Sequence, residues 1–188
     1  MVTERDHWLS ITDELGWKRN HISDPNISQD ETIDAIVSAF PDDNLERIVE
    51  IGCGYGRLTS VIAGWYPDAT VSGIDINPAV LACALPGASY YCADHLTDFR
   101  NQDAIYSVAL FQHLPHDEQR FYICEAADAL RPGGVFRLQF IEGDRDNFCD
   151  HWTPLERMRG WFDEALLDVG SVDRGLAHPQ WTWITGIK

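Results

Sequence analysis

Short runs of β-forming residues alternate with amphipathic helical segments along most of this 188-residue sequence. Such alternation predicts a parallel β-sheet, because parallel strands need crossover connections and these are usually helices. The length suits a single domain over residues 1–188. The expected strands lie at about 47–51, 70–75, 88–92, 104–110 and 135–141, with two more within 170–187.

Helix-start signals locate several of the crossover segments. Ser28 followed by Glu31 has the spacing of a capping box. Asn77 followed by Pro78 combines a good N-cap with proline at the first helical position. A further helix over about 57–66 is expected to turn four apolar side chains inward. These four are Leu58, Val61, Ile62 and Trp65.

The charge balance is strongly acidic, with 30 Asp and Glu residues against 14 Lys and Arg and a formal net charge of −16. Because like charges repel, this balance argues against a nucleic-acid partner. Hydrophobic residues make up 45% of the chain, which excludes wholesale disorder. No stretch approaches the roughly 18 apolar residues of a membrane span, and the first residues lack the apolar run of a signal peptide.

Cysteine usage gives a further indication of the compartment. The five cysteines are odd in number and include no C-x-x-C pair. This pattern indicates neither a disulfide framework nor a zinc knuckle. We therefore expect a soluble cytoplasmic protein without a membrane partner.

A glycine-rich loop follows the first expected strand, in the sequence Val49-Glu-Ile-Gly-Cys-Gly-Tyr-Gly56. Glycines between a buried strand and a helix allow a sharp turn and the close approach of a ligand. The dinucleotide fingerprint G-x-G-x-x-G would need its third glycine one position later, where Arg57 stands. A nicotinamide-dependent reductase is therefore the weaker interpretation of this loop.

Carboxylates end the next two strands. Asp75 lies 23 residues after Gly52, where an acidic side chain can bridge the two hydroxyls of a ribose. The alternative role, capping the next helix, already suits Asn77. Asp94 ends the third strand and could accept a hydrogen bond from an adenine amino group. Because ligands bind beyond the carboxyl ends of such strands, these features are expected to meet.

Taken together, these motifs resemble those of class I S-adenosylmethionine-dependent methyltransferases of the small stand-alone type. The resemblance covers about residues 46–141 and is specific for cofactor and fold but not for substrate. It implies a Rossmann-like α/β fold with a seven-stranded sheet of order 3-2-1-4-5-7-6, strand seven antiparallel, and helices on both faces. The matching stretches are Val49–Thr59, Gly73–Pro78, Cys92–His95, Tyr106–Pro115 and Ala129–Gly134.

The resemblance also implies where the cofactor, S-adenosylmethionine, and its product, S-adenosylhomocysteine, would bind. Glu50 would lie under the methionine end, Asp75 would hold the ribose and Ile76 would pack on the adenine. The glycine loop would line the path of the cofactor, and the residues ending strands three and four would contact its adenine and methionine ends. The implied cofactor-binding residues are Glu50, Gly52, Cys53, Gly54, Gly56, Asp75, Ile76, Asp94, His95, Ser107 and Val108.

His113, just beyond strand four, is the candidate catalytic residue. Oxygen and many nitrogen nucleophiles must lose a proton during methyl transfer, so a nearby base assists. In related small-molecule methyltransferases this histidine is a base in some members and structural in many others. His116 is a weaker candidate.

No metal is expected. Catechol-type enzymes of this family place an Asp-Asn pair after strand five, and Asp146 and Asn147 could supply one. They also need an acid after strand four, where Ser107 and Val108 stand instead. The segment after strand five is therefore expected to be a solvated loop over the mouth of the pocket.

The leading hypothesis is methyl transfer to an oxygen or nitrogen of a small molecule by a monomer or homodimer. Residues 1–27 are expected to form an N-terminal lid over a core of residues 28–188, with Trp8, Trp17 and His21 either over the cofactor or packed in the core. A methyltransferase fold without catalytic activity, which binds or regulates a partner, remains the alternative.

Overall fold

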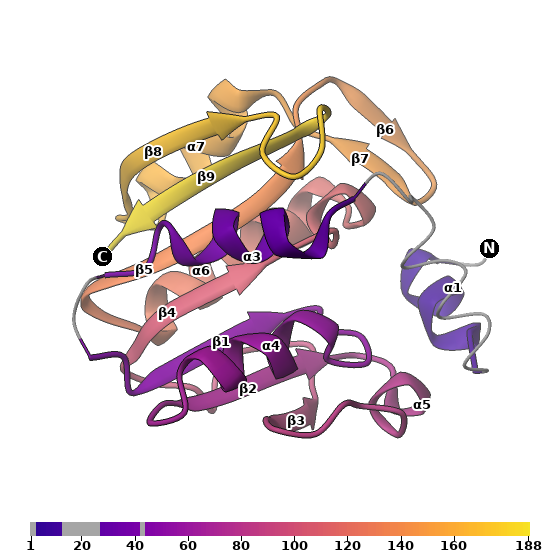
Figure 1. Ribbon diagram of the computed structural model, residues 1–188. Helices are drawn as coiled ribbons and strands as arrows, with labels where there is room; N and C mark the ends of the chain where they lie inside the picture. The colour runs from indigo at the N-terminus through magenta and orange to yellow at the C-terminus, as the bar shows by residue number, and fades with distance from the viewer. Residues whose placement is uncertain (1–2, 13–26, 42–43) are drawn as a thin grey trace.

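The computed structural model describes residues 3–12, 27–41 and 44–188. Its centre is a seven-stranded sheet of order β3-β2-β1-β4-β5-β9-β8, in which β9 runs antiparallel to both of its neighbours (Figure 1). With β9 as the seventh strand in the family numbering, the predicted topology is confirmed. The strands are β1 (Arg47–Ile51), β2 (Thr70–Asp75), β3 (Ser89–Cys92), β4 (Gln102–Ser107), β5 (Leu130–Ile141), β8 (Asp168–Arg174) and β9 (Trp181–Ile187).

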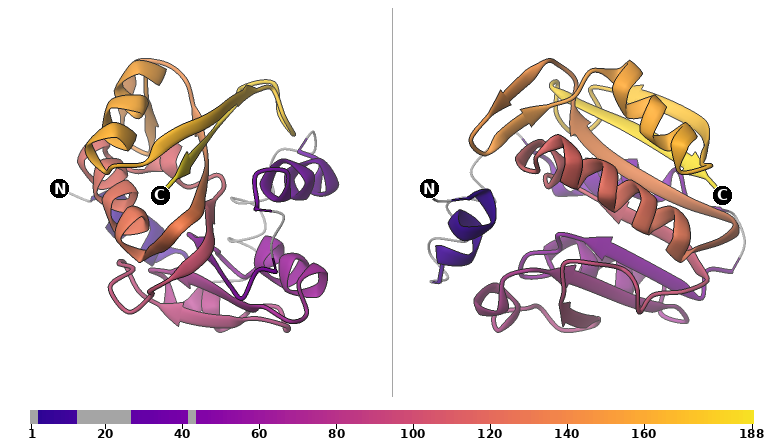
Figure 2. Two further views of the ribbon diagram at one scale, coloured as in Figure 1. Left: turned by 90° about the vertical axis from the view of Figure 1, so that its left-hand side faces the viewer. Right: turned by 180° about the vertical axis from the view of Figure 1, so that it is seen from behind.

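Helices cover both faces of the sheet (Figure 2). The helices α3 (Gln29–Val37) and α4 (Arg57–Trp65) pack on one face, in a core that includes Ile48 of β1 and Trp183 of β9. The other face packs against α6 (His116–Ala129) and α7 (Leu155–Glu164). The two faces of β5 separate these cores, since Phe136, Leu138 and Phe140 point to α6 and α7 while Val135 points to α3.

Local sequence signals explain where two of the helices begin. The Ser28 hydroxyl accepts a hydrogen bond from the Glu31 backbone N–H, at 3.2 Å, and so caps α3. The Asn77 side chain accepts from the Ala79 backbone N–H, at 2.8 Å, and caps the short helix α5 (Pro78–Leu81). Both predicted helix starts are confirmed.

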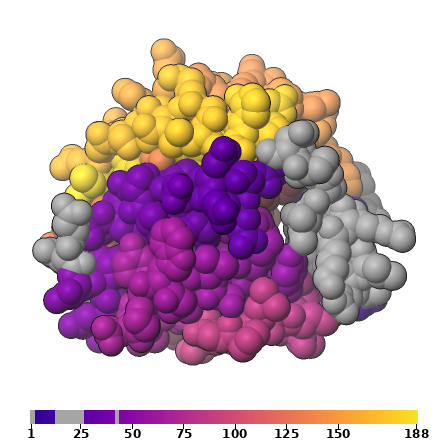
Figure 3. All heavy atoms as spheres, in the orientation of Figure 1, coloured from indigo at the N-terminus to yellow at the C-terminus, as the bar shows by residue number. Residues whose placement is uncertain are grey.

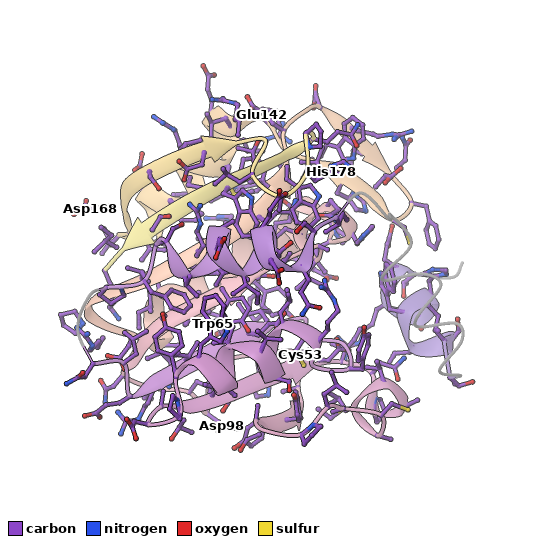
Figure 4. The ribbon with its side chains drawn as sticks, viewed as in Figure 1. Cys53, Trp65, Asp98, Glu142, Asp168 and His178 are labelled. Carbon is purple, nitrogen blue, oxygen red and sulfur yellow. The ribbon has the colours of Figure 1, made fainter. Side chains whose placement is uncertain are left out.

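The predicted inward orientation of Trp65 is wrong. Leu58 and Ile62 are buried, whereas Trp65, the last residue of α4, is 54% exposed. Figure 4 shows Trp65 and Cys53 at opposite ends of this helix. The helical period predicted the buried stripe correctly, but the stripe leaves the core where the helix ends.

The chain after β4 and β5 also differs from expectation. β4 ends at Ser107 because Ala109 adopts a left-handed conformation (φ +56°), and a 3-10 turn, η1 (Phe111–His113), follows. The segment after β5, predicted as a solvated loop, instead contains a hairpin of β6 (Arg145–Asn147) and β7 (Asp150–Trp152).

The carboxyl ends of β1 and β2 point toward the side of the molecule that carries the helix α1 (Glu4–Ser10) (Figure 1). The β6–β7 hairpin lies on the same side, above α1. In the space-filling view of Figure 3, α3 and α4 cover the middle of the face that is turned toward the viewer. Within the described ranges, no helix has the length and apolar character needed to cross a membrane.

Candidate functional site

The glycine loop between β1 and α4 is pinned to the neighbouring strand β2. The backbone N–H groups of Gly52 and Cys53 both donate to the Ile74 carbonyl, at 2.9 and 3.0 Å. The glycines at 52, 54 and 56 all have positive φ angles, of +73°, +55° and +79°. Residues other than glycine rarely adopt this backbone conformation, so the loop depends on these three glycines.

Gly54 and Gly56 face different surroundings. A Cβ atom added at Gly54 would meet nothing within 4 Å, whereas one at Gly56 would overlap the Tyr90 hydroxyl. Gly54 therefore leaves open space for a ligand. Gly56 instead allows Tyr90 to pack beneath the loop.

The Asp75 carboxylate connects the glycine loop to the end of β2. Its Oδ2 accepts from the Gly54 backbone N–H at 2.9 Å, and its Oδ1 accepts from the Asn77 backbone N–H at 2.9 Å. A carboxylate can accept about four hydrogen bonds, so both oxygens retain capacity for ribose hydroxyls. Burial raises the pKa of Asp75, and the two backbone donors oppose that shift.

Glu50 is a buried carboxylate at the end of β1, with 2% of its surface exposed. Its Oε2 accepts hydrogen bonds from the hydroxyls of Thr59 and Tyr106, the latter at 3.0 Å. Burial raises the pKa of Glu50 to about 7, although both hydroxyl donors act to lower it. A cation bound beside this side chain would favour its ionised form.

The His113 imidazole is held by the β6–β7 hairpin. Its Nδ1 lies 2.7 Å from the backbone oxygen of Cys149. Because a carbonyl oxygen can only accept, Nδ1 carries the proton and Nε2 keeps the lone pair in the neutral ring. Burial lowers the pKa of His113, which keeps the ring neutral near pH 7.

The helix α1 covers this site through contacts with several elements. Arg5 forms a 2.8 Å ion pair with Asp94, and the Asn77 side-chain amide donates to the Trp8 carbonyl at 2.8 Å. The Trp8 ring lies 5.1 Å from the His113 ring, measured between centroids. α1 thus contacts the loops after β2, β3 and β4.

One cavity at the carboxyl ends of the strands collects most of the predicted site. Figure 4 shows Cys53 of the glycine loop at this end of the sheet. The predicted residues that line the cavity are Glu50, Gly52, Cys53, Gly54, Asp75, Ile76, Val108 and His113.

Four predicted cofactor residues do not line this cavity. Gly56 packs against Tyr90, as described above. Ser107 is fully buried, and its hydroxyl donates to the Ile51 carbonyl at 2.9 Å, which joins β4 to β1. The remaining two are Asp94, which pairs with Arg5, and His95, whose Nδ1 lies 2.8 Å from the Thr97 hydroxyl.

Several further residues line the cavity and were not predicted from the sequence; some of them lie inside the matching motifs but were given no role there, and the others come from α1 and α6. They are Glu4, Arg5, Tyr55, Arg57, Ala93, Leu110, Glu118 and Tyr122, among others. Glu118 and Tyr122 of α6 are four positions apart, which brings them to one face of the helix, and this i, i+4 spacing is the only sequence signal for that pair. Trp17 and His21, proposed for the lid, lie outside the described residues.

The carboxylates after β5 serve local structure. Glu142 forms a 2.9 Å ion pair with Arg174, and Asp146 contacts the His151 ring at 2.6 Å. Among the residues that the structure describes, no group of three or more His, Cys, Asp and Glu side chains is arranged to hold a metal ion.

The cavity has the features that S-adenosylmethionine requires. Asp75 offers carboxylate oxygens for a ribose, and the absent Cβ of Gly54 leaves room beside the backbone. Buried Glu50 supplies negative charge for a cationic ligand. Ile76 and Tyr122 provide apolar surface for a base.

Comparison with known proteins identifies the family. A family model for the methyltransferase domain matches residues 48–134. Trans-aconitate 2-methyltransferase from Variovorax paradoxus is 36% identical over 148 residues, covering 74% of this chain and 54% of the relative. The chain belongs to the class I S-adenosylmethionine-dependent methyltransferases. The predicted family is therefore confirmed.

Solved structures of class I methyltransferases share the fold. Magnesium protoporphyrin IX methyltransferase from Synechocystis PCC 6803 superimposes with a TM-score of 0.73 at 15% identity, covering 98% of this chain and 94% of that one. An amino pentose methyltransferase from Micromonospora echinaspora gives 0.69 at 20% identity, covering 85% and 89%.

The sequence relatives are longer than this methyltransferase chain. The Methylobacterium nodulans trans-aconitate 2-methyltransferase is 35% identical over 98 residues, which cover 50% of this chain and 37% of the relative. The chain thus matches between a third and about half of the length of these curated relatives.

Proposed function

We propose that this chain catalyses methyl transfer from S-adenosylmethionine to an oxygen or nitrogen atom of a small molecule. The observation that carries the proposal is the convergence of Glu50, Gly54 and Asp75 with His113 in one cavity at the carboxyl ends of the strands. Membership of the methyltransferase family supports the same function.

The chain's own residues would hold the cofactor by charge and hydrogen bonding. Asp75 would accept from the ribose hydroxyls while it keeps its two backbone donors. Glu50 would place negative charge beneath the cationic end, and Ile76 would pack on the base, since both line the cavity. When bound, S-adenosylmethionine supplies a methyl group activated by a sulfonium sulfur. α1 would cover this site and exclude water from it.

His113 is proposed as the general base. Its Nδ1 donates to the Cys149 carbonyl, so the lone pair on Nε2 is available to take the proton of the nucleophile. The lowered pKa of the ring keeps this lone pair free at neutral pH. Transfer of the proton to Nε2 would leave the nucleophile with a free electron pair, and the bond that this pair makes to the methyl carbon would replace the carbon–sulfur bond, whose electrons stay on sulfur.

The acceptor is proposed to be small. The net charge of −16 opposes a nucleic-acid acceptor. The relatives named for trans-aconitate make carboxylic acids the first compounds to test, and an amine series provides the comparison.

The test is a product assay with methyl-labelled S-adenosylmethionine over a panel of small carboxylic acids, phenols and amines. We expect a labelled product with at least one acceptor class for the wild type. For His113→Gln we expect a loss of turnover of about 100-fold or more, with cofactor affinity nearly unchanged. Saturable cofactor binding without product across the panel would favour the silent binding module, and unchanged turnover in His113→Gln would refute the base.

A further inference from the structure

The side chain of Gln119, on the first turn of α6, ties together the two segments that meet at His113. Its Nε2 donates to the backbone carbonyls of Phe111 and Leu114, each at 2.9 Å. These two residues flank His113 in the chain. The same amide nitrogen also donates to the His151 carbonyl, at 3.0 Å, in the hairpin strand β7.

The second of these segments provides the partner of the imidazole. Cys149, whose carbonyl lies 2.7 Å from His113 Nδ1, precedes His151 by two residues in the same hairpin. Gln119 therefore holds the turn that carries the ring and also the hairpin that supplies its hydrogen-bond acceptor. Among the described residues, α6 makes one longer hydrogen bond to a carbonyl of this hairpin, from His116 Nε2 to Trp152 at 3.2 Å.

The orientation of the Gln119 amide is determined by its partners. Backbone carbonyls can only accept, so the atom that faces the three of them must be the amide nitrogen. The Oε1 atom then accepts from the Thr153 hydroxyl at 2.7 Å. Two amide hydrogens then serve three acceptors in a side chain that is 1% exposed. A buried amide with every polar atom engaged has one low-energy arrangement, which makes it a rigid support.

We infer that Gln119 is a positioning residue that fixes the tautomer and orientation of His113 by fixing the distance between η1 and the hairpin. Loss of the amide donors would release the hairpin from η1, so that the Cys149 carbonyl no longer selects the Nδ1–H tautomer. The catalytic consequence rests on the proposed role of His113 as base, whereas the effect on the tautomer does not.

The test compares Gln119→Met, which is close in shape and lacks the amide, with Thr153→Val as a matched control. Thr153→Val removes a buried hydrogen bond from the same network but leaves in place the three hydrogen bonds that the Gln119 amide nitrogen donates. The primary readout is the ¹⁵N chemical shifts of the His113 ring nitrogens, assigned by their disappearance in His113→Gln. Gln119→Asn, which keeps an amide but withdraws it by one methylene, provides a milder variant if Gln119→Met does not fold.

We expect His113 to be in the Nδ1–H form in the wild type and in Thr153→Val, and to show a substantial Nε2–H population in Gln119→Met or Gln119→Asn. Once an acceptor is known, we expect turnover to fall about tenfold or more in Gln119→Met, while S-adenosylhomocysteine affinity changes less than about twofold. A folded Gln119 variant that keeps the wild-type tautomer would overturn the inference. A change in tautomer without any detectable methyl transfer would support the positioning role and contradict the proposed function instead.

Discussion

Replacement of Glu50 by glutamine tests whether the buried, ionised carboxylate beneath the cavity lowers the stability of the fold. Glu50 is buried beneath the cavity, and burial raises its pKa from the ordinary 4.5 to about 7. Between these values the folded protein binds a proton that the unfolded chain has released. The contribution of Glu50 to stability therefore falls as the pH rises from about 4.5, and the loss is complete above about pH 7.

The magnitude follows from the two pKa values. A difference of one in pKa corresponds to about 1.4 kcal/mol. The rise in the pKa of Glu50 from 4.5 to about 7 therefore lowers the stability of the fold by about 3 kcal/mol when the side chain is fully ionised. At pH 5 the corresponding cost is about 1 kcal/mol, because most of the folded population is still protonated. Glutamine does not titrate, and it can still accept from the Thr59 and Tyr106 hydroxyls.

The assay is urea unfolding of the wild type and Glu50→Gln at pH 5 and pH 8 without ligand. We expect Glu50→Gln to gain about 2 kcal/mol relative to the wild type between the two pH values, and to bind S-adenosylhomocysteine and S-adenosylmethionine more weakly. Glu46→Gln, at an exposed position just before β1, controls for the loss of one charge. A difference between wild type and Glu50→Gln that is the same at both pH values would refute the reasoning.

Three further predictions follow from the site. Gly54→Ala should lose about 1 kcal/mol of stability, because alanine is strained at the left-handed φ of this position. Its affinity for S-adenosylhomocysteine, measured by calorimetry, should fall at least about tenfold, because the added Cβ occupies the open space left for the ligand. The control Gly64→Ala, within α4, should instead stabilise the fold by about 0.5–1 kcal/mol. Arg5→Gln should change stability by less than about 1 kcal/mol, since the ion pair of Arg5 with Asp94 is exposed. The variant should nevertheless release bound ligand faster in stopped-flow experiments, and an unchanged release rate would contradict a role for α1 as the cover of the site. Because burial lowers the pKa of His113, the unfolded chain binds more protons near pH 6, so the wild type should lose stability relative to His113→Gln as the pH falls from 7 to 5.

The parts of the site that lie within the first β-α-β unit were predictable from the sequence. Gly52, Gly54 and Asp75 follow two adjacent parallel strands, and strand order alone brings them to one edge of the sheet. The helix caps at Ser28 and Asn77 were also local, because each caps a backbone N–H two or three residues away.

The parts that depend on contacts between distant segments were not predictable. Arg5 reaches Asp94 across 89 positions of the chain, and no periodicity records such a pair. The Gln119 network joins α6 to a hairpin about 30 residues later, and the hairpin itself lacked the alternating apolar pattern of a strand pair. Similarly, the sequence gives no sign that Tyr90 packs beneath the loop, where it would overlap a Cβ atom at position 56.

The most direct test of the account is calorimetric titration of S-adenosylhomocysteine into the wild type and into Asp75→Ala under identical conditions. The account predicts saturable one-to-one binding to the wild type and an affinity loss of about 1–3 kcal/mol in Asp75→Ala, from the hydrogen bonds that the carboxylate would make to the ribose. Absence of binding heat with the wild type for both S-adenosylhomocysteine and S-adenosylmethionine, or saturable binding of NADH in their place, would contradict it.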